Sequence, residues 1–123
     1  MSDGKQKFVL LVTHGPEDPE TATIPFVMAT TAQALDKEVL MGFQSKGVFL
    51  MMKGMADHVA ACGFPALTDL MNAYVEGGGK MYVCGPCMEA RKISEDELIE
   101  GASVVGAATF VAECAEAENV LVY

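Results

Sequence analysis

Two cysteines separated by two residues are the part of this sequence whose type and spacing best suit chemistry. Cys84 ends the apolar run 80–84, and Cys87 follows it after Gly85-Pro86. The thiolate is the reactive form of cysteine, and backbone N–H groups at the start of a helix stabilise it. A second thiol three positions later can attack a disulfide or persulfide formed on the first. The spacing therefore predicts a nucleophilic Cys84 with Cys87 as its resolving partner.

Three further residues could take part in thiol chemistry or simply pack. His14 follows the first apolar run, 7–13, so we expect it near Cys84, where it would hold a thiolate or deliver a proton. The alternative for His14 is a loop histidine bonded to the backbone. Cys62 lies in an irregular stretch and Cys114 in a helical one. We predict that both of these cysteines are packing thiols.

Apolar runs alternate with helical patterns along the chain, and this alternation must place the cysteines. Short apolar runs predict five strands, and apolar residues at helical spacing predict the helices between them. The expected strands cover 7–13, 38–43, 47–51, 80–84 and 119–123. The expected helices begin at Thr23, cover 65–76, begin at Ser94, and cover about 104–117, whereas 52–64 is a loop or a short irregular helix.

Local signals fix where several of these helices begin and end. Thr23 can cap the first helix, and Pro25 is tolerated in its first turn. Ser94 and Glu97 form a capping box that predicts a helix start. The glycines 77–79 end the helix 65–76, and because they precede a strand they are a turn and not a phosphate-binding loop. We expect no cofactor.

The order of elements predicts an α/β fold in a single domain, 1–123. Strands that alternate with helices form a mostly parallel, roughly five-stranded sheet with helices on both faces, which gives a three-layer domain. Binding sites in such sheets lie beyond the carboxyl ends of the strands. The loops 14–16 and 84–87 both leave predicted strands at that edge. The thiol pair and His14 are therefore expected at one site.

Charge and composition exclude several classes of function. The net charge is −9, with 17 acidic against 8 basic residues, so neither nucleic acid nor an anionic membrane is an expected partner. Hydrophobic residues make up 51% of the chain, which is enough for a core. No apolar run is long enough to span a bilayer, and residues 1–7 lack secretory features. A cytoplasmic protein with free thiols is the expectation.

Several segments follow one another in a recognisable order: Phe8 to Pro16, Glu38-Val39, Gly47-Val48, Tyr82-Val83-Cys84 and Val120-Leu121-Val122-Tyr123. In this order they resemble the DsrE/DsrF-like sulfur-relay family, which includes the TusD type. The resemblance implies a parallel sheet of flavodoxin-like or Rossmann-like topology, assembled as a homotrimer or a dimer of trimers. It also implies that Cys84 carries sulfane sulfur as a persulfide between donor and acceptor proteins. Cys87 is outside the shared pattern.

Two other function classes stay open beside the sulfur carrier. A thioredoxin-like dithiol oxidoreductase would use Cys84 and Cys87, although the motif comes late in the chain and no Trp precedes it. A non-catalytic or metal-binding subunit would hold zinc through the cysteines, across a trimer or with Cys62 and a histidine. Structural zinc sites usually take four ligands from two such pairs, and the chain has one pair. We therefore predict no metal site.

Overall fold

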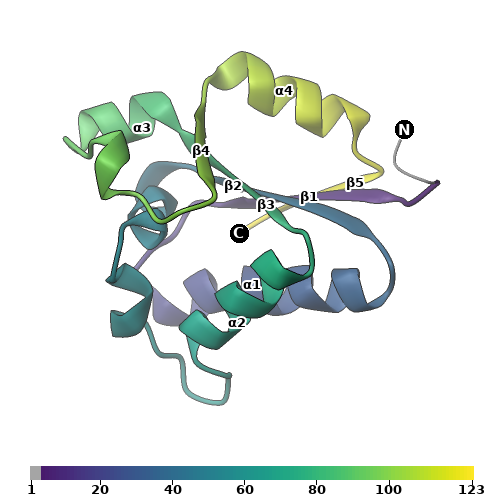
Figure 1. Cartoon of the computed structure of the whole chain (residues 1–123), viewed down its shortest axis with the longest axis horizontal. Helices are drawn as coiled ribbons and strands as arrows, with labels where there is room; N and C mark the ends of the chain where they lie inside the picture. Colours follow the sequence, from purple (N-terminus) through teal and green to yellow (C-terminus); the bar gives the residue numbers. More distant parts are fainter. Residues whose placement is uncertain (1–3) are drawn as a thin grey trace.

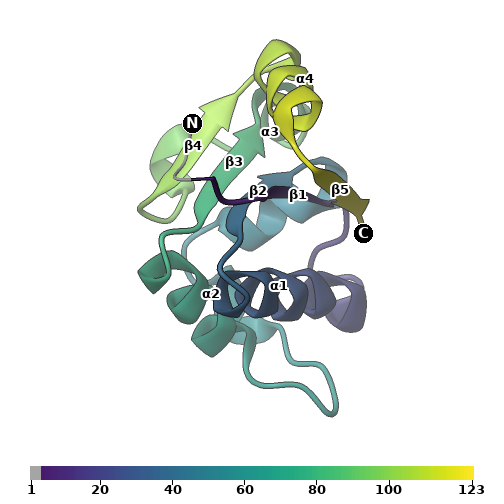
Figure 2. The same cartoon turned by 90° about the vertical axis from the view of Figure 1, so that its right-hand side faces the viewer.

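One parallel sheet forms the centre of the computed structural model, which describes residues 4–123. The strands lie in the order β4-β3-β2-β1-β5. Helices α1 and α2 cover one face, and α3 and α4 lie on the other (Figure 1). The turned view in Figure 2 shows the same three layers. The predicted three-layer α/β fold is confirmed. The strands are β1 (Lys7–Val12), β2 (Glu38–Phe43), β3 (Lys80–Cys84), β4 (Ala102–Val105) and β5 (Asn119–Val122), and the helices are α1 (Pro19–Ala34), α2 (Leu67–Glu76), α3 (Gly85–Ala90) and α4 (Ala107–Glu116).

The segment 1–7 was expected to lack secretory features, and its residues 1–3 lie outside the described part of the chain. Within residues 4–123, no helix has both the length and the apolarity that crossing a bilayer requires.

The three central strands end level with one another, which decides where the loops meet. Val12 of β1 pairs with Phe43 of β2, and Phe43 pairs with Val83 of β3. All three side chains are buried, as expected of strands covered on both faces. Cys84 therefore lies one residue beyond this common line, where the segments after β1, β2 and β3 converge.

Helix α1 begins earlier than the sequence predicted. Asp18 is its N-cap, and the Asp18 side chain accepts the N–H of Thr21 at 3.2 Å and the hydroxyl of Thr21 at 2.8 Å. The predicted cap, Thr23, is instead inside the helix, where its hydroxyl donates to the carbonyl of Pro19 at 2.7 Å. Pro25 consequently lies in the interior of α1 and not in its first turn. The cap is therefore Asp18, five residues before the predicted Thr23.

The segment predicted as a strand over 47–51 is the 3-10 helix η1 (Ser45–Met51). Val48, Leu50 and Met51 are buried, and a short buried apolar run has no periodicity that distinguishes a strand from a helical segment. A second 3-10 helix, η2 (Met55–His58), follows within the segment expected to be irregular. The strand prediction at 47–51 was wrong.

A strand takes the place of the helix predicted after Ser94. The capping box of Ser94 and Glu97 is present, but it starts only the 3-10 turn η3 (Glu95–Glu97). The turn ends because Leu98 forms an antiparallel bridge with Met52. The missed strand β4 then takes Val104 and Val105, which had been assigned to the last helix. Five strands were predicted, but one of them was misplaced and one was missed.

A buried tyrosine on α2 ties the helix layer to the sheet. Tyr74 is fully buried, and its hydroxyl lies 2.6 Å from the carbonyl oxygen of Lys80 and 3.2 Å from that of Val39. Its ring meets the ring of Phe26 edge-on, with 6.1 Å between centroids. The hydroxyl therefore satisfies carbonyl groups at the amino ends of β2 and β3.

Tyr74→Phe should lower the free energy of unfolding by about 1–2 kcal/mol, because buried carbonyl groups lose their donor. Urea denaturation followed by circular dichroism measures this difference. Tyr82→Phe is the matched control, since Tyr82 is only half-buried on β3 and water can replace its hydroxyl. Equal effects of the two substitutions would contradict the role given to the Tyr74 hydroxyl.

Candidate functional site

Cys84 occupies the junction between β3 and α3. It is the last residue of the strand and the N-cap of the helix, and its Sγ accepts the backbone N–H of Cys87 at 3.2 Å. Pro86 lies in the first turn of α3, where its missing N–H costs no hydrogen bond. The side chain of Cys84 is half-buried against the core. The structure thus brings the predicted pair together at the carboxyl edge of the sheet.

Cys87 also receives a backbone donor, from a segment distant in sequence. The N–H of Ser45, at the start of η1, lies 3.3 Å from Sγ of Cys87. Ser45 has φ of 51°, a left-handed conformation that is uncommon for residues other than glycine. Strained backbone of this kind often occurs at functional sites. Each sulfur of the pair therefore has one N–H donor.

The turn that carries Ser45 is packed tightly against the end of β1. The N–H of Gln44 donates to the carbonyl of Val12 at 3.0 Å. A Cβ added to Gly47 would lie 2.1 Å from the same carbonyl oxygen, and one added to Gly15 would lie 2.4 Å from that of Lys46. Only glycine permits these approaches, so the turn cannot shift toward β1. Its position fixes the donor that faces Cys87.

The groups around Cys84 have opposite effects on the pKa of its thiol. Burial raises the pKa of the Cys84 thiol, and the neighbouring Cys87 thiol raises it further. The N–H of Cys87 and the positive charge of Arg91 act in the opposite direction, but the pKa of Cys84 remains above its ordinary value. The N–H donors predicted from the sequence are therefore present, but they do not by themselves make Cys84 a strongly acidic thiol.

Arg91 lies directly after α3 and contacts both sides of the site. Its Nη1 donates to the carbonyl oxygen of Cys87 at 3.2 Å. Its guanidinium carbon lies 5.9 Å from the centroid of the Phe49 ring, a distance typical of a cation–π contact. Arg91 thus connects the cysteine helix with η1.

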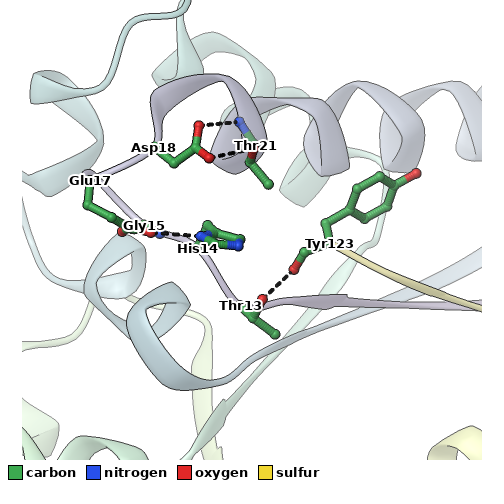
Figure 3. A network of polar contacts seen from close by, with 7 residues as sticks. All are labelled: Thr13, His14, Gly15, Glu17, Asp18, Thr21 and Tyr123. Carbon is green, nitrogen blue, oxygen red and sulfur yellow. Dashed lines mark hydrogen bonds and ion pairs between the residues drawn. The ribbon is translucent and has the colours of Figure 1, made fainter.

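His14 lies at the same edge but interacts with another group. Its Nδ1 is 2.8 Å from a carboxylate oxygen of Glu17, and the other carboxylate oxygen accepts the N–H of Gly15 at 2.8 Å (Figure 3). Partial burial would raise the pKa of Glu17, but these hydrogen bonds hold the pKa below its usual value. Within residues 4–123, the hydrogen bond of the His14 ring goes to Glu17. The Gln44–Gly47 turn packs between the β1 loop and Cys87.

The point where the strand order reverses lies between β1 and β5, beside the His14 loop. Open parallel sheets commonly bind ligands at such a point. Here the hydroxyl of Thr13 donates to the carbonyl of Tyr123 at 2.7 Å (Figure 3). The carboxylates of Glu17 and Asp18 accept the nearby N–H groups. The donors that hold phosphate groups in dinucleotide-binding folds are thus bonded to the chain's own side chains.

The two remaining cysteines lie away from the pair. Cys62 is exposed, so the prediction that it packs in the interior was wrong. The loop that carries it separates η2 from α2 and leaves the side chain in solvent. Cys114 is half-buried on α4, beside Leu11 and Phe110, which agrees with packing. Within residues 4–123, no group of three or more His, Cys, Asp or Glu side chains is arranged to hold a metal ion.

Sequence reasoning missed two groups at the site, the Ser45 amide and Arg91. No sequence pattern predicts the direction of the Ser45 N–H, because this direction depends on a left-handed backbone conformation at a serine. Arg91 did carry a signal, since it is the only arginine in the chain and follows Cys87 by one helical turn. Residues four apart on a helix lie on the same face.

Cys87→Ala should lower the pKa of Cys84, because it removes the thiol that raises this pKa and keeps the backbone N–H that donates to Sγ. A larger thiolate fraction at mildly alkaline pH should then speed alkylation of Cys84 by iodoacetamide severalfold. Peptide mass spectrometry over a pH series measures the rate at Cys84, with Cys114→Ala as the control. An unchanged or slower reaction in Cys87→Ala would refute the influence assigned to Cys87.

Known proteins resemble the chain over nearly its whole length. A model of the DsrE/DsrF-like family matches residues 6–123. The uncharacterized protein MJ0989 of Methanocaldococcus jannaschii is 30% identical, over 95% of this chain and 99% of that protein. The uncharacterized protein MK0008 of Methanopyrus kandleri is 30% identical, over 98% of this chain and 97% of its own length. The uncharacterized protein MJ0760 of M. jannaschii is 34% identical over 83% of this chain, which spans 37% of that protein.

Solved structures share the fold at lower identity. The ychN protein of E. coli has a TM-score of 0.81 and 17% identity, covering 96% of this chain and 99% of that chain. MTH1491 of Methanobacterium thermoautotrophicum has a TM-score of 0.70 and 16% identity, over 97% and 100%. The structural neighbours confirm the fold, and the family model confirms the resemblance predicted from the sequence. The chain therefore belongs to the DsrE/DsrF-like family.

Proposed function

We propose that the protein is a sulfur carrier in which Cys84 accepts sulfane sulfur as a persulfide and passes it to an acceptor protein. One observation carries the proposal: two thiols at the carboxyl edge of the sheet each receive a backbone N–H, from Cys87 and from Ser45. Such donors favour anionic sulfur without making the site strongly acidic. Membership of the DsrE/DsrF-like family supports the same chemistry.

Loading of Cys84 needs no external oxidant. The Cys84 thiolate attacks the terminal sulfur of a donor persulfide, the S–S bond of the donor breaks, and a new S–S bond forms on Cys84. The donor leaves as a thiolate and takes up the proton that Cys84 released. The sulfane sulfur keeps its oxidation state, because it moves from one thiol sulfur to another.

Unloading has two routes, which differ in the role of Cys87. An acceptor thiolate can attack the outer sulfur and so restore the Cys84 thiolate. Alternatively, Cys87 can attack the inner sulfur, which forms a Cys84–Cys87 disulfide and releases hydrosulfide. The second route then needs two electrons from an external thiol to restore the pair. Cys84 and Cys87 lie at the start of the same short helix, with the Cys87 N–H 3.2 Å from Sγ of Cys84, and this proximity supports the second route.

The charge of the protein favours protein partners with basic surfaces. The net charge of −9 favours donors and acceptors with basic docking surfaces. His14, held by Glu17 at the same edge, is our candidate for moving a proton during docking. We place the protein in the cytoplasm, where thiols stay reduced.

A dithiol oxidoreductase is the second candidate function. The observation that favours it is the placement of Cys84 and Cys87 at the start of α3, where the N–H of Cys87 donates to Sγ of Cys84 at 3.2 Å. In that case the pair would cycle between a dithiol and an internal disulfide and would exchange electrons with partner thiols.

Intact mass spectrometry after incubation with a small-molecule persulfide separates these candidates. We expect a labile adduct of one sulfur atom on the wild type and on Cys87→Ser, and none on Cys84→Ser. Reduction by dithiothreitol should remove the adduct. Cys62→Ser is the matched control, since Cys62 is exposed and outside the site.

An adduct that persists in Cys84→Ser would refute Cys84 as the carrier. Loss of the adduct in both Cys84→Ser and Cys87→Ser would make the pair the working unit. A wild type that gains no sulfur and forms an internal disulfide would favour the oxidoreductase.

We also infer that the protein is a homo-oligomer, a trimer or a dimer of trimers as the family resemblance implies. An apolar surface on α4 and β5 supports this inference, because Val111 is 67% exposed and Val122 is 64% exposed. Beside them lies a hollow of about 440 Å³ lined by Leu11, Phe110, Cys114 and neighbouring residues. Gln44, at the start of the turn that holds Cys87, lies on the rim of this hollow.

Val111→Lys should dissociate the oligomer, because association would bury the introduced charge. Light scattering coupled to size-exclusion chromatography measures the mass of each variant. Val75→Lys is the matched control, since Val75 is an exposed valine on α2, on the opposite face of the sheet. A monomeric wild type would contradict the inference.

A further inference from the structure

Arg91 is unusual both in its type and in its place. It is the only arginine in a chain with a net charge of −9, and it lies immediately after the helix that carries Cys87. Its side chain is half-buried, so its guanidinium is held by neighbouring groups and not free in solvent. Arg91 takes no part in the bond changes of the proposed loading reaction.

The contacts of Arg91 join the two segments whose backbone N–H groups donate to the cysteine sulfurs. Nη1 donates to the carbonyl of Cys87 at 3.2 Å, on the side of α3. The guanidinium carbon lies 5.9 Å from the ring centroid of Phe49, on the side of η1. The same η1 begins at Ser45, whose N–H points at Cys87. A lysine could not form both contacts as well, because it lacks the planar fork that stacks and donates together.

The charge of Arg91 also acts on the carrier sulfur. The titratable side chains on the elements packed against Cys84 are few, and β4 carries none. Burial and the Cys87 thiol raise the pKa of Cys84, whereas the Cys87 N–H and, more weakly, the charge of Arg91 lower it. The other titratable side chains on these elements are Glu89 on α3, Lys46 in η1, and Lys80 and Tyr82 on β3.

We propose that Arg91 is a positioning residue for the sulfur on Cys84: it fixes α3 against η1 and stabilises anionic sulfur at the pair through its charge. This rests on the proposed function, in which the nucleophile is the Cys84 thiolate and the loaded form is a persulfide. The hydrogen bond of Arg91 goes to the Cys87 carbonyl and not to either sulfur, so Arg91 acts through that carbonyl and through its charge.

Alkylation of Cys84 by iodoacetamide over a pH series tests the proposal without any persulfide. In Arg91→Gln, which can still donate to the Cys87 carbonyl but has no charge, the midpoint of the rate profile should move to higher pH. The rate below the midpoint should fall severalfold. Arg91→Lys should lie between Arg91→Gln and the wild type. Lys92→Gln, which removes an exposed charge at the next position, should match the wild type.

Three results would overturn the proposal. They are an unshifted Arg91→Gln, an Arg91→Lys that is no better than Arg91→Gln, and a Lys92→Gln that shifts as far as Arg91→Gln. Circular dichroism reports whether each variant folds. If Arg91→Gln does not fold, Phe49→Leu takes its place, because it removes the stacking ring and keeps the charge. Phe49→Leu should then shift the midpoint in the same direction, and an unshifted midpoint would overturn the proposal.

The two hypotheses fail separately. If the wild type gains no sulfur from a small-molecule persulfide but the Arg91 variants shift the alkylation profile, the sulfur-carrier function fails and the effect of Arg91 on the Cys84 thiolate stands. If the wild type is loaded but Arg91→Gln alkylates like the wild type, the carrier function stands and the role of Arg91 is refuted.

Discussion

The close packing of the Gln44–Gly47 turn against the end of β1 is the constraint on which the thiol site depends. Gly47 approaches the Val12 carbonyl so closely that a Cβ there would lie 2.1 Å from its oxygen. The turn is therefore held at one distance from the sheet, and the Ser45 N–H is directed at Cys87. Because Cys87 in turn donates its own N–H to Cys84, the position of a turn after β2 determines the surroundings of a sulfur after β3.

The sequence was sufficient to predict the fold class and the position of Cys84, because long buried strands and a cysteine pair have direct sequence signals. It was insufficient where burial was uniform or elements were short. The run 47–51 is apolar and mostly buried, as a central strand would be, so the sequence predicted a strand there. Strand β4 has four residues between Gly101 and Gly106, which is too short to give a clear pattern. The Ser45 amide and the contacts of Arg91 depend on backbone geometry and on segments about 40 residues apart, which no local pattern encodes.

The site and the topological reversal of the sheet lie on different strands. The reversal, between β1 and β5, is a place where open parallel sheets commonly bind ligands, but here Glu17 and Asp18 bond to the local N–H groups. The two thiols after β3 are the groups to which we assign the chemistry. A carrier of sulfur needs a nucleophile, donors for an anion and access for partners, and the end of β3 provides the first two on adjacent elements.

The most direct test of the central claim is a crystal structure of the protein after loading with sulfane sulfur. We expect additional density for one sulfur atom bonded to Sγ of Cys84, with the Cys87 N–H and the Gln44–Gly47 turn still in place. Additional density on Cys62 or Cys114 with an unmodified Cys84 would contradict it. So would a loaded protein in which the turn has moved away from Cys87, since the geometry of the site would then not be the one that holds the sulfur.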